Sequence, residues 1–159
     1  MKSLAAIDPG PTQSAFVIWD GTRILQMGIW DNEKVMNLLD WSYLDLGFDS
    51  AIPDALIIEK IESMGMAVGA SVFETVYWTG IFAHTYGLNF TVRVGRRDVK
   101  MHLCNNARAK PANIRQALID RFEPDLLPRQ RPKGILKGLS DHTWAAFALA
   151  VTWWDQHAI

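Results

Sequence analysis

The run ALIIEKI at residues 55–61 constrains the fold of this chain more than any other segment. A near-continuous apolar run of this length is typical of a strand that is buried on both faces of a sheet. Such a strand needs helices on both sides, so the run predicts an α/β fold. Glu59 interrupts the run, and an ionised carboxylate in a buried strand is costly unless it is paired or bound to a metal. A salt bridge to Lys60 or to an arginine is the alternative to a functional role.

Turn signals and apolar periodicity divide the rest of the chain into short strands and helices. Three segments joined by tight turns precede the run and predict an antiparallel meander. The expected architecture is therefore a mixed five-stranded sheet, with three antiparallel strands and then two further strands, flanked by α-helices. The expected strands are residues 3–7, 14–19, 22–30, 55–61 and 90–94. The expected helices are one from Asp31 or Asn32 to Gly47, and others at 68–83, 97–104, 112–122 and 140–154, with a basic loop at 123–136.

Length and composition limit the class of protein. The chain has 159 residues, 49% hydrophobic and 21% charged, as expected for one globular domain spanning residues 1–159. No apolar run reaches the ~18 residues needed to span a bilayer, and the N-terminus has too few apolar residues for a signal peptide. Cys104 is the single cysteine, which excludes an intrachain disulfide. We therefore expect a cytoplasmic protein with no membrane partner.

Charges are unevenly distributed along the chain, although they nearly cancel overall. Residues 1–92 contain four Lys and Arg against eleven Asp and Glu, whereas residues 93–137 contain twelve against four. A basic segment of this kind is typical of proteins that bind a polyanion. A solvated surface on which charges merely cluster is the alternative.

Three carboxylates occur where the polar ends of the expected elements meet. Asp8 ends the first strand before a Pro-Gly turn, Glu59 lies in the central strand, and Asp141 opens the last helix. Taken singly, Asp8 is suited to cap a turn and Asp141 to a helix N-terminus. Taken together, adjoining carboxylates repel, and a hard cation such as Mg²⁺ relieves that repulsion. A pair of carboxylate-held metal ions beside a basic surface is suited to phosphodiester hydrolysis.

Four segments carry a resemblance to a known family. They are AIDPGPTQSAFVIWD, IIEKI, VGRRDVKMHLCNNARAKPANIRQALIDRF and GLSDHTWAAFALAVTWW. In this order they resemble the RuvC-like Holliday junction resolvases of the RNase H-like nuclease superfamily, phage-type members included, over almost the whole chain. The resemblance implies a metal-dependent endonuclease that resolves four-way DNA junctions by paired cuts in recombination and repair. It further implies two Mg²⁺ ions per site, with Mn²⁺ as a substitute, and a homodimer, for which the helix at 68–83 is the expected interface.

Individual residues take their expected roles from this resemblance. Asp8, Glu59 and Asp141 match the metal-binding acids of the family. Lys110 matches a catalytic lysine beside the cleavage site, and Lys100 matches a lysine that approaches the backbone phosphate. The expected DNA-binding residues are Lys100, Lys110, Arg96, Arg97, Arg108, Met64 and Met66.

The last helix departs from the family pattern of two ligands spaced three residues apart. Trp144 stands three residues beyond Asp141 and cannot bind a metal. If the ALAVT tail is aligned instead, His142 falls on the first ligand position and Ala145 on the second. The missing ligand is therefore absent, or is replaced by His142, or comes from elsewhere, for example from Glu62.

A second departure leaves the substrate range open. The aromatic wedge often found after the glutamate is missing, so Met64 or Met66 is expected to serve in its place. A nuclease with a broader range, which debranches Y-forks and flaps as phage-type relatives do in the host cytoplasm, is one alternative. A non-catalytic protein that binds branched DNA is another. IDPGPT also resembles the phosphate-binding opening of actin-like kinases and ATPases, but these need two such domains and leave the basic segment unexplained.

Overall fold

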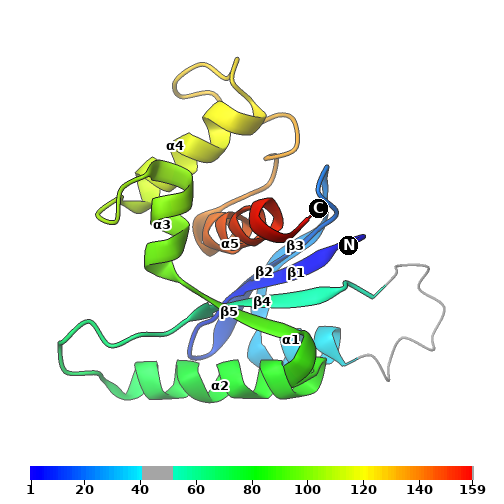
Figure 1. The fold of residues 1–159 in the computed structure, drawn as a ribbon, viewed down its shortest axis with the longest axis vertical. Helices are drawn as coiled ribbons and strands as arrows, with labels where there is room; N and C mark the ends of the chain where they lie inside the picture. The colour runs from blue at the N-terminus through cyan, green and yellow to red at the C-terminus, as the bar shows by residue number, and fades with distance from the viewer. Residues whose placement is uncertain (41–51, 159) are drawn as a thin grey trace.

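The computed structural model describes residues 1–40 and 52–158. Five strands form one mixed sheet in the order β3-β2-β1-β4-β5, with helices on both faces (Figure 1). The strands are β1 (Leu4–Asp8), β2 (Gln13–Trp19), β3 (Ile24–Asp31), β4 (Ala55–Lys60) and β5 (Thr91–Gly95). The helices are α1 (Asn32–Leu39), α2 (Ala70–Tyr86), α3 (Arg96–Cys104), α4 (Pro111–Phe122) and α5 (Asp141–His157), with a 3-10 turn η2 at Leu88–Phe90. The predicted α/β architecture is confirmed.

Strand directions bring the two predicted strand carboxylates to one edge of the sheet. β1, β2 and β3 pair antiparallel, as the turn signals predict, whereas β1 pairs parallel with β4, and β4 pairs parallel with β5. The carboxyl ends of β1, β4 and β5 therefore point the same way. Ile7 is in register with Ile58, so Asp8 and Glu59 occupy the next positions on neighbouring strands.

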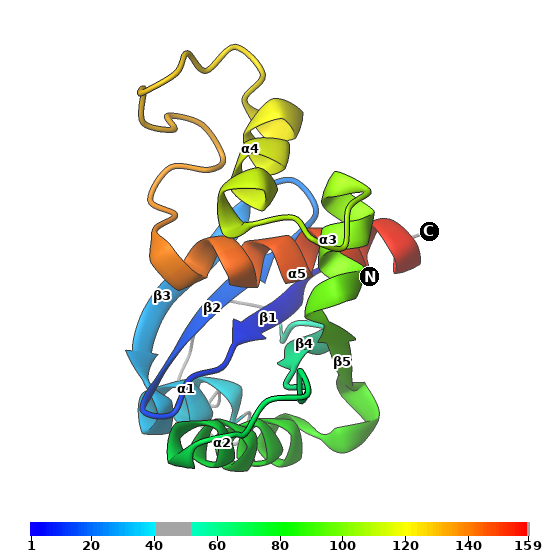
Figure 2. The same ribbon diagram turned by 90° about the vertical axis from the view of Figure 1, so that its left-hand side faces the viewer.

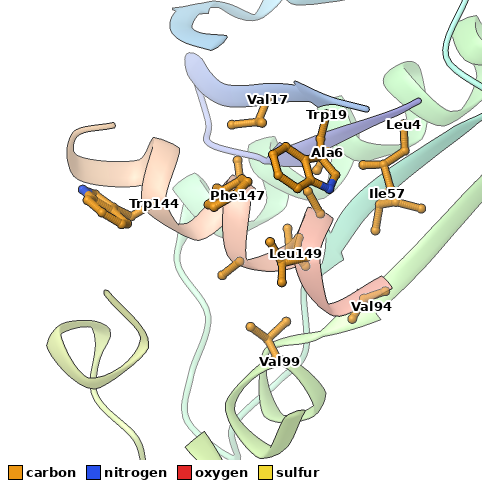
Figure 3. Close-up of a cluster of buried hydrophobic side chains, with 14 of the residues drawn as sticks. Leu4, Ala6, Val17, Trp19, Ile57, Val94, Val99, Trp144, Phe147 and Leu149 are labelled. Atoms are coloured by element: carbon orange, nitrogen blue, oxygen red, sulfur yellow. The ribbon is translucent and has the colours of Figure 1, made fainter. Parts of the chain in front are cut away.

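Helices cover both faces of the sheet (Figures 1 and 2), and a cluster of buried apolar side chains lies on each face. α5 covers one face, where Phe147 packs in a cluster with Trp19 and Ile57 (Figure 3). α1 and α2 cover the other face, where Phe82 packs in a cluster with Ile58. β4 lies between the two clusters, which explains its near-continuous apolar sequence.

Most boundaries lie within about two residues of the prediction. β5 begins at Thr91 because the residues before it form η2. β3 begins at Ile24 because Asp20 accepts backbone hydrogen bonds from Thr22 and Arg23, at 2.9 and 2.8 Å, and so extends the preceding turn. The predicted continuation of the first helix through Ser42 and Leu46 to Gly47 lies outside the described residues.

α2 exposes one of its apolar faces to solvent. Phe73 and Tyr77 are 64% and 62% exposed. The opposite side of the helix is buried, and there Thr79 donates its hydroxyl to the Thr75 carbonyl at 2.9 Å. Because both sides are apolar, periodicity does not decide which side faces the core. No helix in the described parts of the chain has the length and apolar character needed to cross a membrane.

Candidate active site

Two buried carboxylates meet at the carboxyl ends of β1 and β4. The side chains of Asp8 and Glu59 are each only 7% exposed. Burial, a side-chain hydrogen bond to Glu59 and the negative charge of Glu59 together raise the pKa of Asp8 to about 7. The Asp8 side chain bonds to other side chains of the site, which distinguishes it from an ordinary turn-capping aspartate.

His142 of α5 contacts Asp8, one member of this pair. Its Nδ1 lies 2.8 Å from Asp8 Oδ2, and its ring is 74% exposed. Asp141 lines the same cavity, but within the described part of the chain its side chain makes no hydrogen bond. Its φ of 39° lies in the left-handed region, which is uncommon for a residue other than glycine. Of the ligands considered for α5, the structure therefore brings His142 to Asp8.

Glu62, the other residue considered as a ligand, lies outside this group. It accepts a hydrogen bond from Lys60 Nζ at 2.7 Å and does not line the cavity that contains Asp8. Trp144, at the position where the family pattern has a ligand, is buried, with Arg115 5.0 Å from the centre of its ring.

Glu59 is ion-paired with an arginine. Arg96 Nε donates to Glu59 Oε1 at 2.6 Å, and this bond raises the pKa of the guanidinium. The salt bridge considered as an alternative for Glu59 is thus present, with Arg96 and not Lys60 as the partner. The Arg96 side chain is 68% exposed, so it reaches the buried carboxylate from the solvent side.

A buried polar network supports the turn that follows Asp8. The Gly10 N–H donates to Ser14 Oγ at 3.1 Å, and Ser14 Oγ donates to Asn32 Oδ1 at 2.6 Å. Asn32 Nδ2 donates back to the Gly10 carbonyl at 3.0 Å. A Cβ on Gly10 would lie 2.3 Å from the Gln13 carbonyl oxygen, so the turn requires glycine. In the sequence Asn32 marks only a possible start of the first helix, and nothing in the sequence indicates that its side chain is buried.

A cavity of about 460 Å³ opens over the carboxylates. The acidic and imidazole groups form one wall, Lys100 and Arg96 contribute positive charge, and the remainder is largely apolar. Residues at the carboxyl ends of β1 and β4, on α3, at the start of α4 and on α5 line the cavity. Figure 2 shows how these elements are arranged. Its lining residues are Asp8, Glu59, Arg96, Val99, Lys100, Pro111, Ile114, Asp141, His142, Trp144, Ala145, Ala148 and Leu149.

The other predicted DNA-binding residues lie outside the cavity. Lys110 is exposed at the N-cap of α4, where its backbone N–H donates to Asn113 Oδ1 at 2.8 Å. Two exposed methionines lie on the segment between β4 and α2, and two exposed arginines lie on or just after α3. These four residues are Met64, Met66, Arg97 and Arg108.

The donor chemistry of the carboxylate pair fits a hard divalent cation. Mg²⁺ in proteins is commonly held by one or two carboxylates, with water and substrate phosphate at the other positions. Asp8 and Glu59 supply two such carboxylates, and the pKa of Asp8 is raised first by burial and then by the neighbouring Glu59. Across residues 1–40 and 52–158, no three His, Cys, Asp or Glu side chains are grouped so that they could hold a metal by themselves.

Comparison with solved structures defines the fold class. A structure of Thermus thermophilus RuvC superposes with a TM-score of 0.62 at 15% sequence identity, covering 98% of this chain and 96% of that one. T. thermophilus RuvC in complex with Holliday junction substrate gives a TM-score of 0.61 at 16% identity, covering 96% and 92%. No family model and no curated protein matches the sequence. The chain has an RNase H-like α/β fold, and within that class its fold is RuvC-like.

Proposed function

We propose that this protein is a structure-selective, metal-dependent endonuclease that resolves four-way DNA junctions. The observation that carries this proposal is the buried Asp8–Glu59 pair in the position where β1 and β4 of a RuvC-like fold end. Buried neighbouring carboxylates are costly in a purely structural role. Their placement in a cavity bordered by basic helices favours chemistry on a phosphodiester.

Asp8 and Glu59 would hold the cation, with His142 as a further donor beside Asp8. Mg²⁺ is the expected ion, with Mn²⁺ as a substitute and two ions per site. When bound, such ions lower the pKa of an attacking water and stabilise the attacking and leaving oxygens of the phosphodiester. The network of Ser14 and Asn32 holds the turn that carries Asp8, and so fixes one of the two carboxylates.

Basic residues beside the cavity are suited to hold the DNA backbone. Lys100 lies in the cavity wall and can reach the phosphate nearest the carboxylates. Lys110, Arg97 and Arg108 lie farther out on α3, α4 and their connection, where they can contact flanking phosphates. DNA binding should therefore weaken steeply as salt is raised, because each neutralised phosphate releases counterions.

Two symmetric cuts require two active sites, and a C₂ homodimer supplies them. The exposed apolar face of α2 is the proposed interface, since Phe73, Val76 and Tyr77 are 64%, 49% and 62% exposed. Exposed apolar residues gathered in this way typically mark an interaction surface.

A nicking assay tests the proposal. A labelled synthetic four-way junction is incubated with Mg²⁺ or with EDTA, beside a linear duplex of the same sequence. Paired nicks at symmetric positions that need Mg²⁺ and spare the duplex would support a resolvase. Tight junction binding without nicks in either Mg²⁺ or Mn²⁺ would instead identify a non-catalytic branched-DNA binding protein.

A broader debranching nuclease is the second candidate, and the segment after β4 favours it. Met64 and Met66 are 82% and 75% exposed there, and residues 61–69 contain no aromatic side chain. Flexible methionines adapt to surfaces of different shape more readily than a rigid ring does. Equal nicking rates on a Y-fork, a flap and the four-way junction would favour this broader activity.

A further inference from the structure

Arg96 compensates the charge of Glu59 in a way that leaves the arginine itself mostly in solvent. The bonded Glu59 side chain is 7% exposed, whereas the Arg96 side chain is 68% exposed. In the described part of the chain, no other cationic side chain pairs with Glu59. The pair thus consists of a buried carboxylate and a guanidinium that can move into solvent without passing through the core.

The sheet register explains why this arginine is the one that reaches Glu59. β5 runs parallel to β4, with Val94 opposite Glu59 and Gly95 opposite Lys60. The chain then enters α3 at Arg96, which is the first residue beyond the strand. Arg97, the next residue, is exposed and makes no ion pair among the described residues. Arg96 is therefore bonded to a carboxylate of the site, whereas the adjacent Arg97, which carries the same charge, is not.

A divalent cation bound at the carboxylates would compete with Arg96 for the Glu59 carboxylate. Glu59 Oε1 accepts the Arg96 bond at 2.6 Å, and the positive charge of Arg96 acts on Asp8 as well as on Glu59. A guanidinium and a hard cation that share one carboxylate oxygen also repel each other. Binding of the cation and retention of this ion pair are therefore in competition.

We propose that Arg96 is a built-in counter-ion of Glu59, which a divalent cation must displace, and that Arg96 thereby sets the affinity of the site for the cation. The inference rests on the proposed function and adds a positioning residue to it. In the metal-free protein Arg96 holds the Glu59 side chain in place through this bond, and on cation binding the guanidinium swings into the solvent-facing part of the cavity.

Calorimetric titration of the DNA-free protein with MnCl₂ at pH 8.5 tests this role. Arg96→Gln removes the competing cation, so its dissociation constant for Mn²⁺ should fall about tenfold relative to wild type. Arg97→Gln is the matched control, because it makes the same change in net charge one residue away, and it should stay within about twofold. Arg96→Lys keeps a cation but loses the guanidinium Nε–H, and should give an intermediate affinity.

The thermal unfolding temperature is a second measurement, and it reports on folding. In EDTA, Arg96→Gln should unfold at a lower temperature than Arg97→Gln, and saturating Mn²⁺ should remove most of that difference. Equal Mn²⁺ affinities in wild type and Arg96→Gln, or weaker binding by Arg96→Gln, would overturn the counter-ion role while leaving the proposed function standing. If Arg96→Gln does not fold, an unchanged affinity in Arg96→Lys has the same meaning. A lack of Mn²⁺ binding in every protein would overturn the proposed function as well.

Discussion

Neighbouring groups act in opposite directions on the pKa of Asp8 in the metal-free protein. Burial, together with the bond to Glu59 and its charge, raises the pKa of Asp8 to about 7, while His142 acts to lower it. At neutral pH this carboxyl therefore retains its proton in a substantial fraction of molecules. A cation that binds there replaces the proton, so binding should strengthen as pH rises through 7.

The raised pKa makes the stability of the metal-free protein depend on pH. The unfolded chain releases this proton near pH 4, whereas the folded chain releases it near pH 7. Between these values the folded state binds more protons, so stability should fall as pH rises and level off above about pH 7. The loss attributable to Asp8 is at most about 4 kcal/mol. Urea unfolding in EDTA from pH 4.5 to 8 measures it.

Two variants separate this effect from the titration of other groups. Asp8→Asn should remove most of the fall in stability across that window. Asp141→Asn, the same chemical change at an exposed position in the same cavity, should retain it. Identical pH profiles for Asp8→Asn and wild type would show that Asp8 titrates normally.

Asn32 should contribute to both stability and activity, although it lies away from the cavity. Asn32→Ala leaves the buried Ser14 hydroxyl and the Gly10 carbonyl without their partner, at a cost of about 1–3 kcal/mol. We also expect slower nicking at a temperature where the variant is folded, because the Asp8 turn loses its support. Asn37→Ala, an exposed substitution on the same helix, is the control for melting temperature and nicking rate.

The residues of the site differ in how far the sequence could predict them. Glu59 was apparent because a charge interrupts an apolar strand, which is a local signal. The Arg96–Glu59 pair depends on the register of β4 with β5, two strands separated by 30 residues of chain from Lys60 to Thr91. Which of Asp141 and His142 lies against Asp8 depends on the rotation of α5 about its axis, which apolar periodicity fixes only coarsely.

The carboxylate of Asp155 joins three helices, α3, α4 and α5. Asp155 of α5 accepts two hydrogen bonds from Arg121 of α4, at 2.6 and 2.7 Å, and one contact from His102 of α3 at 2.7 Å. Burial raises the pKa of Asp155, but these bonds outweigh it and hold the pKa below its usual value. The network links the two basic helices to the helix that carries His142.

Removal of this carboxylate should loosen the basic helices. Asp155→Asn is expected to cost about 1 kcal/mol at pH 7, since the network is partly exposed. Because the pKa of Asp155 is lowered, this contribution is present at neutral pH and is lost as pH falls below about 4. Faster hydrogen exchange in α4 and weaker junction binding would confirm the link. Asp125→Asn, an exposed acid near the end of α4, should change neither measurement.

The uneven distribution of charge along the sequence corresponds to a separation of basic and apolar surfaces in the folded protein. The basic segment forms α3, α4 and the loop that follows, on the α5 side of the sheet (Figure 1). The apolar face of α2 lies on the opposite side of the sheet. The basic helices proposed to bind DNA and the α2 face proposed as the dimer interface thus lie on different sides of the sheet, so we expect substitutions to disrupt each one separately.

The dimer can be tested on its own. Phe73→Glu places a charge in the centre of the proposed α2 interface and should convert a dimer to a folded monomer by light scattering after gel filtration. Leu127→Glu, at an apolar residue of similar exposure on the α4–α5 loop, should remain a dimer. In the monomeric variant the rate of paired nicking should fall more than the rate of single nicking. A wild-type monomer at micromolar concentration would contradict the proposed interface.

In the proposed function the buried carboxylate pair is needed for metal-dependent cleavage of branched DNA but not for binding it. The most direct test compares cleavage and binding for Asp8→Asn on the same four-way junction, with Mg²⁺ for cleavage and Ca²⁺ for binding. Removal of a metal-binding carboxylate should lower the nicking rate by at least about a thousandfold, while the dissociation constant changes less than about threefold. Loss of both activities in parallel, or nicking at the wild-type rate, would contradict the role proposed for Asp8 and Glu59.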